Sequence, residues 1–373
     1  MKEKWSIVEL KIMRRALVLA RKGLYGAHPN PMVGCVIAKN GRIISEGYHK
    51  EFGSLHAEIM AINKVKDKSM LEDSDLFLTL EPCTHIGKQP PCIDTIRQIR
   101  WRNIYIASED CDKRVCGEGI KILRKDGFSV RFGLLEEEAI NLNKVFFTFK
   151  IQKRPFITLK AAVSTNGFLA WKDGHSKWLS CEKSLIEAHK LRAEADGILV
   201  GRETVQNDNP ELTTRLFKGR SPKRFIIDRR NKLSLKYKVF EQKSPVTYYI
   251  TTKRNLHKEA QLAKNGHKMI ILNESNNKIN MEELMFKLHE LDISHLLVEG
   301  GGKTISEFIN NSLFDKLILC VTPFILPQGR GFAFFNESNT SHPSLALKLI
   351  FQKNIGQDLW LEYQLLKEPY EFA

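Results

Sequence analysis

The order of apolar and polar residues predicts helices and strands in alternation along the first part of the chain. Ser6 and Glu9 form a capping box ahead of apolar residues at helical spacing, so a helix should begin there and end near Gly23. Two short apolar runs then flank Asn40-Gly41, which is the pattern of a β-hairpin. The predicted strands lie at 33–38, 42–47, 75–80 and 103–107, and the predicted helices at 56–66, after Pro90 and at 120–125.

A second alternation follows a basic segment at 150–160. It predicts helices at 182–193, 256–264 and 281–290, and strands at 156–163, 197–201, 224–228, 246–251, 268–272, 295–299, 316–321 and 358–364. Strands that alternate with helices are typical of α/β domains, in which helices cover both faces of a sheet. The 373 residues suffice for two such domains, which we expect at 1–150 and 151–373.

Composition narrows the class of protein. Hydrophobic residues make up 42% of the chain and charged residues 27%, as in ordinary globular proteins. The net charge of +15 favours anionic partners, although a general lysine bias explains it equally well. Seven scattered cysteines do not form the even set of a secreted disulfide framework. The sequence has neither a signal-peptide core nor 18 uninterrupted apolar residues, so we expect a cytoplasmic protein with no membrane partner.

The strongest chemical pattern is a set of metal ligands. His56 and the thiols of Cys83 and Cys92 offer three ligands that suit zinc, with the fourth position left for water. Glu58 lies two residues from His56, so it can face that water without ligating the metal. Zinc lowers the pKa of bound water towards 7, and a nearby carboxylate can pass the proton to a leaving amine. The pattern therefore predicts deamination at an electrophilic ring carbon.

A structural zinc site is the alternative at this point. Such a site needs a fourth protein ligand, and the candidates are His85, Cys111 and Cys116. The spacing of Cys111 and Cys116 fits no zinc ribbon, which favours inert thiols at both positions. His-x-Glu followed by Pro-Cys and a further Cys is more typical of a catalytic site.

This order of residues resembles the zinc-dependent cytidine and nucleobase deaminases. EPCTHIGKQPPC at 81–92, together with HPNPMVGCVI at 28–37, is similar to the deaminase half of the bifunctional riboflavin-biosynthesis deaminase-reductases. Nucleic-acid-editing deaminases instead close their zinc site with Cys-x-x-Cys. The resemblance implies Zn²⁺ ligands at His56, Cys83 and Cys92, a catalytic proton shuttle at Glu58, and pyrimidine-binding residues at Asn30, His49 and His85.

The second half has no G-x-G-x-x-G motif after a strand, so the ordinary Rossmann fingerprint is absent. LLVEGGGKT at 296–304 runs from a strand through glycines into a helix, where backbone N–H groups can bind phosphate, although a tight turn alone also favours glycine. Four segments resemble, in order, the reductase half of the same family, a dihydrofolate-reductase-like fold that uses NADPH. They are RPFITLKAAVSTNG at 154–167, HSKWLS at 175–180, ADGILVGRETVQNDNPELTTR at 195–215 and VEGG at 298–301.

The resemblance covers nearly the whole chain. It implies an α/β protein with an N-terminal cytidine-deaminase-like three-layer domain and a C-terminal dihydrofolate-reductase-like domain. The implied NADPH-binding residues are Ala162, Trp178, Thr204, Asp208, Gly301, Gly302, Lys303 and Thr304, and the implied substrate-binding residues are Ser176, Arg192, Leu212, Arg215 and Glu299. The two arginines suit a sugar phosphate, which guanidinium binds in bidentate fashion, although either alone could be a surface residue.

We expect a two-step enzyme of riboflavin biosynthesis. It would deaminate 2,5-diamino-6-ribosylamino-4(3H)-pyrimidinone 5′-phosphate and then reduce the ribosyl group with NADPH, giving 5-amino-6-ribitylaminouracil 5′-phosphate. The resemblance also implies a homo-oligomer with no nucleic-acid partner. Three alternatives stay open: a tRNA or nucleobase deaminase, a scaffold with a structural zinc, and a deaminase with a decayed reductase. The last rests on Asn166, which stands where the family usually has Asp.

Overall fold

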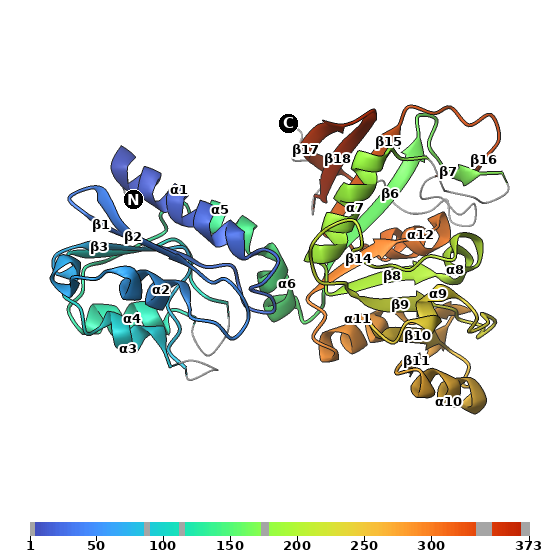
Figure 1. Cartoon of the computed structure of the whole chain (residues 1–373), viewed down its shortest axis with the longest axis horizontal. Helices are drawn as coiled ribbons and strands as arrows, with labels where there is room; N and C mark the ends of the chain where they lie inside the picture. The colour runs from blue at the N-terminus through green and yellow to red at the C-terminus, as the bar shows by residue number, and fades with distance from the viewer. Residues whose placement is uncertain (1–3, 86–89, 112–115, 173–178, 333–344, 367–373) are drawn as a thin grey trace. The chain divides into compact units, whose positions relative to one another are not determined.

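The computed structural model describes residues 4–366 apart from 86–89, 112–115, 173–178 and 333–344 (Figure 1). The chain divides into two compact units, Met1–Lys153 and Arg154–Ala373. The sequence places the boundary at 150/151, inside a helix that continues to Gln152 before the chain leaves the first unit. None of the described helices has both the length and the apolar character needed to cross a bilayer.

The N-terminal unit is built on a five-stranded sheet in the order β2-β1-β3-β4-β5. β1 pairs antiparallel with β2 and β3, and the pairs β3–β4 and β4–β5 are parallel. The strands are β1 (Gly34–Lys39), β2 (Arg42–Tyr48), β3 (Asp75–Leu78), β4 (Asn103–Ile106) and β5 (Val130–Phe132). The α-helices are α1 (Ile7–Ala20), α2 (Ala57–Lys64), α3 (Cys92–Ile96), α4 (Glu118–Lys125), α5 (Glu136–Leu142) and α6 (Lys144–Gln152).

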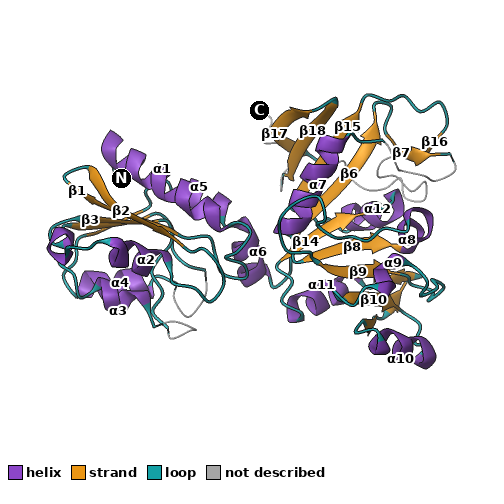
Figure 2. Ribbon diagram, viewed as in Figure 1, coloured by secondary structure: helices purple, strands orange, loops and turns teal. Residues whose placement is uncertain are grey.

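Successive residues of each strand enter opposite cores, because side chains alternate across a sheet. On β1, Val36 packs in a core with residues of α1 and α5, whereas Ile37 packs with residues of α2, α3 and α4. Figures 1 and 2 show α1 and α5 on one face of the sheet and α2, α3 and α4 on the other. The unit is therefore the expected three-layer α/β/α domain.

The local signals at the start of the chain are confirmed. Ser6 caps α1, and the reciprocal bonds of a capping box join it to Glu9. Asn40 and Gly41 both have positive φ, as the turn between β1 and β2 requires. The sequence pattern does not predict α5 or α6.

The C-terminal unit is built on a nine-stranded sheet in the order β11-β10-β9-β8-β14-β6-β15-β18-β17. The pairs from β11 to β15 are parallel, and β18 and β17 add two antiparallel strands at one edge. The sheet strands are β6 (Phe156–Ser164), β8 (Gly197–Gly201), β9 (Lys223–Ile227), β10 (Thr247–Thr251), β11 (Lys268–Ile271), β14 (His295–Glu299), β15 (Lys316–Thr322), β17 (Leu347–Ile355) and β18 (Asp358–Leu365). Two small ribbons pair β7 (Phe168–Trp171) with β16 (Gly329–Phe332) and β12 (Glu274–Ser275) with β13 (Lys278–Ile279).

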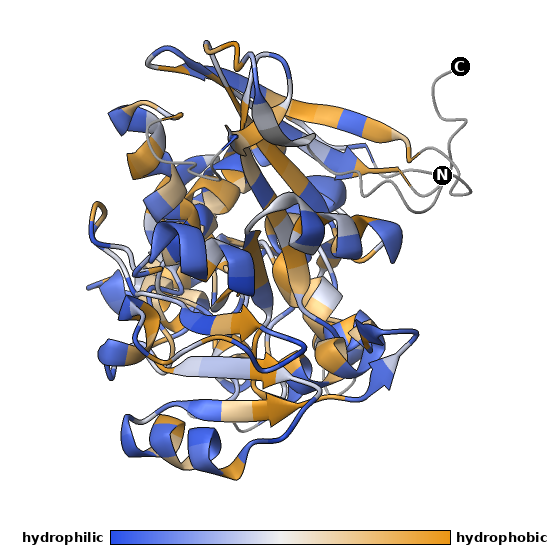
Figure 3. Cartoon of the chain, turned by 90° about the vertical axis from the view of Figure 1, so that its right-hand side faces the viewer, coloured by the Kyte–Doolittle hydropathy of each residue, from blue (hydrophilic) through white to orange (hydrophobic). Residues whose placement is uncertain are grey.

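Helices cover both faces of this sheet as well. On β8, Leu199 packs in the core that includes α11 and α12, and Val200 packs in the core that includes α8, α9 and α10. In Figure 3 the central strands carry long hydrophobic stretches, whereas the helices mix hydrophilic and hydrophobic residues. The helices are α7 (Glu182–Glu194), α8 (Arg202–Asp208), α9 (Lys238–Glu241), α10 (Leu256–Lys264), α11 (Met281–Glu290) and α12 (Gly302–Asn310).

Candidate functional site

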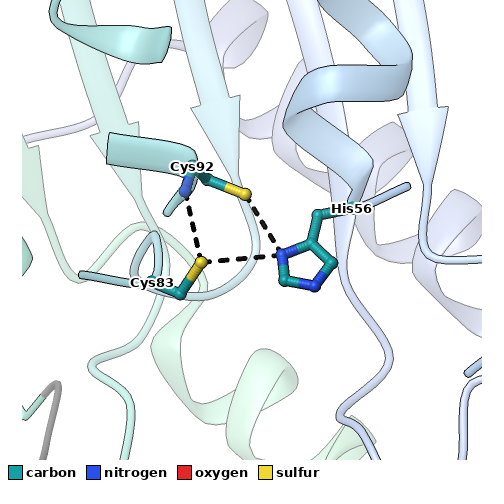
Figure 4. Close-up of side chains that lie close together, drawn as sticks. All are labelled: His56, Cys83 and Cys92. Carbon is teal, nitrogen blue, oxygen red and sulfur yellow. Dashed lines mark hydrogen bonds between the residues drawn. The ribbon is translucent and has the colours of Figure 1, made fainter. Parts of the chain in front are cut away.

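Three side chains with metal-ligating atoms lie together in the N-terminal unit (Figure 4). His56 is the residue before α2, Cys83 lies in the loop after β3, and Cys92 begins α3. The Nδ1 atom of His56 lies 3.1 Å from Sγ of Cys92 and 3.6 Å from Sγ of Cys83. All three ligand atoms lie within 4.8 Å of one another. Zinc bonds of about 2.0–2.3 Å to nitrogen and sulfur fit such a group.

Within the described residues this group includes no fourth protein ligand. His85, Cys111 and Cys116, the candidates for a closed structural site, are not part of it. His85 instead has a buried Nδ1 atom without a hydrogen-bond partner among the described residues. Three ligands of one His and two Cys leave a coordination position for water, which is the arrangement of catalytic rather than structural zinc.

Glu58 is a buried carboxyl in the first turn of α2, 3% exposed. Burial, together with the negative charge of Cys83, raises the pKa of this carboxyl to about 7. Hydrogen bonds with Cys92 and His56 lower the pKa of Cys83, which favours its thiolate. The group thus places a proton-holding carboxyl beside a thiolate and an imidazole.

Asn30 and His49 lie next to this group. The ring of His49 meets that of His56 edge to face at a centroid distance of 5.3 Å, and Nδ2 of Asn30 lies 3.2 Å from Nε2 of His49. Nδ1 of His49 is 3.3 Å from the carbonyl oxygen of Leu55, which can only accept, so this nitrogen carries the hydrogen and Nε2 accepts from Asn30. Burial also lowers the pKa of His49, which keeps the ring neutral.

The sequence gives no hint of one residue that supports this region. Asn143, buried between α5 and α6, accepts a hydrogen bond from the N–H of Met32 at 2.8 Å and donates one to its carbonyl at 2.9 Å. These two bonds span 111 residues of sequence and fix the backbone two residues after Asn30. Only the tertiary structure reveals such a contact.

The C-terminal unit contains a cavity of about 1200 Å³ along the carboxyl ends of its parallel strands. This is the edge at which open α/β sheets bind ligands. Ser176 and Trp178 lie outside the described residues. All other residues expected at NADPH or at the reductase substrate line this cavity: Ala162, Arg192, Thr204, Asp208, Leu212, Arg215, Glu299, Gly301, Gly302, Lys303 and Thr304.

Glycines line the cavity at two neighbouring strands: β8 ends at Gly201, and β14 is followed by Gly300 and Gly301. A Cβ atom on Gly201 would lie 2.5 Å from Oγ1 of Thr304, so a larger residue would displace that hydroxyl group. The N–H of Gly301 donates to Oγ1 of Thr204 at 3.1 Å, and no side chain caps the first turn of α12. Uncapped N–H groups at a helix start suit the phosphates of a dinucleotide, so these residues fit NADPH.

The two arginines expected at a phosphate differ in their surroundings. Arg192 makes a bidentate ion pair with Glu299 at 2.7 and 3.0 Å and also donates to the carbonyl of Thr213. Its guanidinium group is therefore already paired with a carboxylate. Arg215 is exposed and has no hydrogen bond or ion pair with any described residue. Arg215 is the better candidate for a phosphate.

Asn166 has a structural role that Asp could not fill. Its Oδ1 accepts from Oγ of Ser164 at 2.8 Å and from the N–H of Leu326 at 3.1 Å. Its Nδ2 donates to the carbonyl of Leu326 at 2.9 Å. A carboxylate has no hydrogen to donate to that carbonyl. The amide group of Asn166 therefore suits the groups that surround it. Asn in place of the family's usual Asp does not indicate a decayed reductase.

Sequence reasoning missed the cationic residues at the β9 end of the cavity. Arg229 and Arg230 follow β9 and line the cavity with Arg202. Arg229 pairs with Glu274 at 2.6 Å and Arg202 lies 3.7 Å from Asp228, whereas Arg230 is exposed. Their position directly after a predicted strand was the available signal, since such residues lie at the carboxyl edge of a parallel sheet.

The two sites define the class: a zinc-type deaminase joined to a reductase with a dinucleotide-sized cavity. Two family models match, one described as the cytidine and deoxycytidylate deaminase zinc-binding region over residues 7–108 and one as the RibD C-terminal domain over 155–361. The riboflavin biosynthesis protein RibD of Aquifex aeolicus is 37% identical over 94% of this chain and 97% of its own length. That of Escherichia coli is 31% identical over the same shares.

Solved structures agree with these relatives. Acinetobacter baumannii RibD has a TM-score of 0.86 at 29% identity, covering 96% of this chain and 99% of its own. A Thermotoga maritima deaminase/reductase has a TM-score of 0.84 at 34% identity, with the same coverage. The chain belongs to the RibD family, the bifunctional enzymes of riboflavin biosynthesis that combine a zinc-dependent deaminase with an NADPH-dependent reductase. The family match covers both halves of the chain. It therefore argues against the three alternatives: a tRNA deaminase, a scaffold with a structural zinc, and a deaminase with a decayed reductase.

Proposed function

We propose that the chain deaminates 2,5-diamino-6-ribosylamino-4(3H)-pyrimidinone 5′-phosphate and then reduces the ribosyl group of the product to ribityl. The observation that carries this proposal is the group His56, Cys83 and Cys92 beside the buried Glu58. The Thermotoga maritima relative is described as a diaminohydroxyphosphoribosylaminopyrimidine deaminase and 5-amino-6-(5-phosphoribosylamino)uracil reductase, which supports the same substrates here.

In the first step, His56, Cys83 and Cys92 hold zinc, which when bound supplies the Lewis acid that makes water nucleophilic at neutral pH. Glu58 takes the proton of the attacking water and gives it to the amino group that leaves as ammonia. Asn30, His49 and His85 bind the pyrimidine ring. The neutral His49, oriented by the carbonyl of Leu55, keeps Asn30 in one hydrogen-bonding orientation.

In the second step, NADPH supplies hydride to C1 of the ribosyl group, and the chain's residues position the two reactants. The glycines at the end of β8 and after β14 bind the cofactor phosphates together with Thr204 of α8, and Lys303 and Thr304 lie in the first turn of α12 beside them. Arg215 binds the substrate phosphate. Arg192 holds Glu299 in place, so that its carboxylate can accept hydrogen bonds from substrate hydroxyl groups.

The test is mass spectrometry of the product formed from the diaminopyrimidine ribosyl phosphate by zinc-loaded protein with NADPH. We expect a product that is both deaminated and reduced. A product that is only deaminated would remove the reductase from the proposal. An unchanged substrate with zinc-loaded protein would contradict the roles given to the zinc group and Glu58.

We further propose that the protein acts in the cytoplasm as a homo-oligomer on this small molecule and not on nucleic acid. No disulfide joins any of the seven cysteines, and two of them lie in the group of metal-ligating side chains, which supports a reducing compartment. Light scattering of the full chain tests the oligomer, and salt-dependent RNA binding would contradict the absence of a nucleic-acid partner.

A further inference from the structure

Glu81 is a buried carboxylate between β3 and the metal-ligand group. It is 3% exposed and lies two residues before Cys83. Its Oε2 accepts hydrogen bonds from the N–H groups of Gly117 at 2.8 Å and Asp110 at 3.1 Å. Its Oε1 accepts one from the N–H of Ile120 at 3.1 Å. Both oxygens are therefore used, and their donors among the described residues are all backbone N–H groups.

Within the described part of the chain, these bonds take the place of the cation that usually pairs with a buried carboxylate. Among the described residues no Lys or Arg pairs with Glu81, and burying an unpaired charge is costly. Charge-assisted bonds from three N–H groups offset that cost. Two of the donors belong to the start of α4, which has no cap from its own sequence. Glu81 caps this helix from 36 and 39 residues away.

The same contact reaches Cys83 through the backbone. A Cβ atom on Gly119 would lie 2.8 Å from the carbonyl oxygen of Pro82, so α4 packs directly against the residue between Glu81 and Cys83. In addition, the N–H of Ile93 donates to the carbonyl of Cys83 at 3.3 Å. The backbone of Pro82 and Cys83 thus contacts both α4 and α3.

We propose that Glu81 is a positioning residue of the deaminase site, which fixes the backbone of Cys83 for metal binding through its bonds to Asp110, Gly117 and Ile120. The inference rests on the proposed function of the His56, Cys83 and Cys92 group. In E81Q the single amide oxygen cannot accept from all three N–H groups, and the NH₂ group faces a donor. The Cys83 loop then loses its anchor to α4.

The experiment measures how fast the full-length zinc-loaded protein releases its metal to a colorimetric chelator, together with the visible spectrum of the Co²⁺-substituted protein. Loss of groups that orient metal ligands costs about 10- to 100-fold in affinity. Because Glu81 acts through the backbone, we expect E81Q to release zinc about tenfold faster. The thiolate-to-cobalt band should shift as well, which a purely structural change elsewhere would not cause.

E118Q is the matched control. Glu118 is an exposed residue of the same helix that pairs only with Lys121 in the described contacts, so the same change there should leave both readouts unchanged. If E81Q releases zinc at the parental rate with an unchanged cobalt spectrum, Glu81 only caps α4 and the inference is wrong, even if the variant melts earlier. Should E81Q not fold, E81D decides by the same two measurements, with faster release expected because the shorter side chain cannot reach all three donors. A parent protein that binds neither Zn²⁺ nor Co²⁺ contradicts the proposed function itself.

Discussion

The two units of this chain assemble their sites in different ways. In the N-terminal unit the first and last of the three ligand residues are 36 positions apart. His56 and Cys92 stand at the starts of helices, and Cys83 lies in the loop after β3. In the C-terminal unit the cavity is lined by residues from Lys160 to Gly331, gathered from the ends of at least four strands. The first site depends on a few reactive groups, whereas the second depends on the correct order of a large sheet. Variants should therefore affect the two activities separately and to different extents.

The largest expected effect is that of Glu58→Gln. An amide cannot take the proton from water, so deamination should fall about 10²- to 10⁴-fold, the range for loss of a general acid–base group. Mass spectrometry of the product and zinc content by atomic absorption provide the measurement. Reduction of the already deaminated ribosylaminouracil phosphate should continue at the parental rate. Loss of zinc from this variant would contradict the role given to Glu58.

Arg215→Ala is the converse variant in the C-terminal unit. Removing a guanidinium that binds phosphate should raise the KM for the reductase substrate roughly tenfold or more, because hydrogen bonds between charged groups contribute about 1.5–3 kcal/mol. NADPH oxidation followed at 340 nm measures it, with deamination as the unaffected reference. Lys218→Ala, an exposed cation nearby in sequence, is the control. An unchanged KM in Arg215→Ala would show that another cation binds the substrate phosphate.

Asn166→Asp tests how far the second site depends on distant contacts. The carboxylate would face the carbonyl of Leu326 without a hydrogen to donate, and the free energy of unfolding of this unit should fall by about 1–2 kcal/mol. Thermal unfolding monitored by circular dichroism checks this, and the deaminase rate should not change. If Asn166→Asp has the same free energy of unfolding as the parent, Asp and Asn are equivalent at this position.

Ser6→Ala should have the smallest effect. It removes the capping-box bond to the N–H of Glu9 and should lower the free energy of unfolding of the N-terminal unit by about 1 kcal/mol. Chemical denaturation measures the change, while both enzymatic rates at 25 °C should equal those of the parent. A change in either rate would show that α1 influences the sites, which its contacts do not indicate.

Sequence reasoning succeeds here where a signal is local. The capping box at Ser6 and the Asn40-Gly41 turn depend on neighbours a few positions away, and the structure contains both as predicted. The ligand residues lie further apart but stand in short motifs, His-x-Glu and Pro-Cys, and the structure gathers them into one group. The pattern of β14 followed by glycines and a helix is equally local. Family resemblance added the other reductase residues, which no local pattern identifies.

Sequence reasoning fails where partners are distant. Arg192 and Glu299 meet across 107 residues, so their ion pair could not be predicted from spacing. Glu81 caps the N-terminus of α4, and the residues close to Gly117 in the sequence give no indication of this cap. β17 has no alternation of apolar and polar residues, because nearly all its side chains are exposed and its pairing with β18 shifts register. Such features follow from tertiary contacts that a single sequence does not display.

The place of β6 in the larger sheet has a consequence for synthesis on the ribosome. β6 is the first strand of its unit to be translated, yet its two neighbours, β14 and β15, begin only at residues 295 and 316. At typical elongation rates of about 5–20 residues per second, β6 waits on the order of 10–30 s for them. During that interval its apolar residues lack their native cover and are open to chaperones. The N-terminal unit has all five strands by residue 132, so the deaminase half can be complete while the reductase half is still a nascent chain.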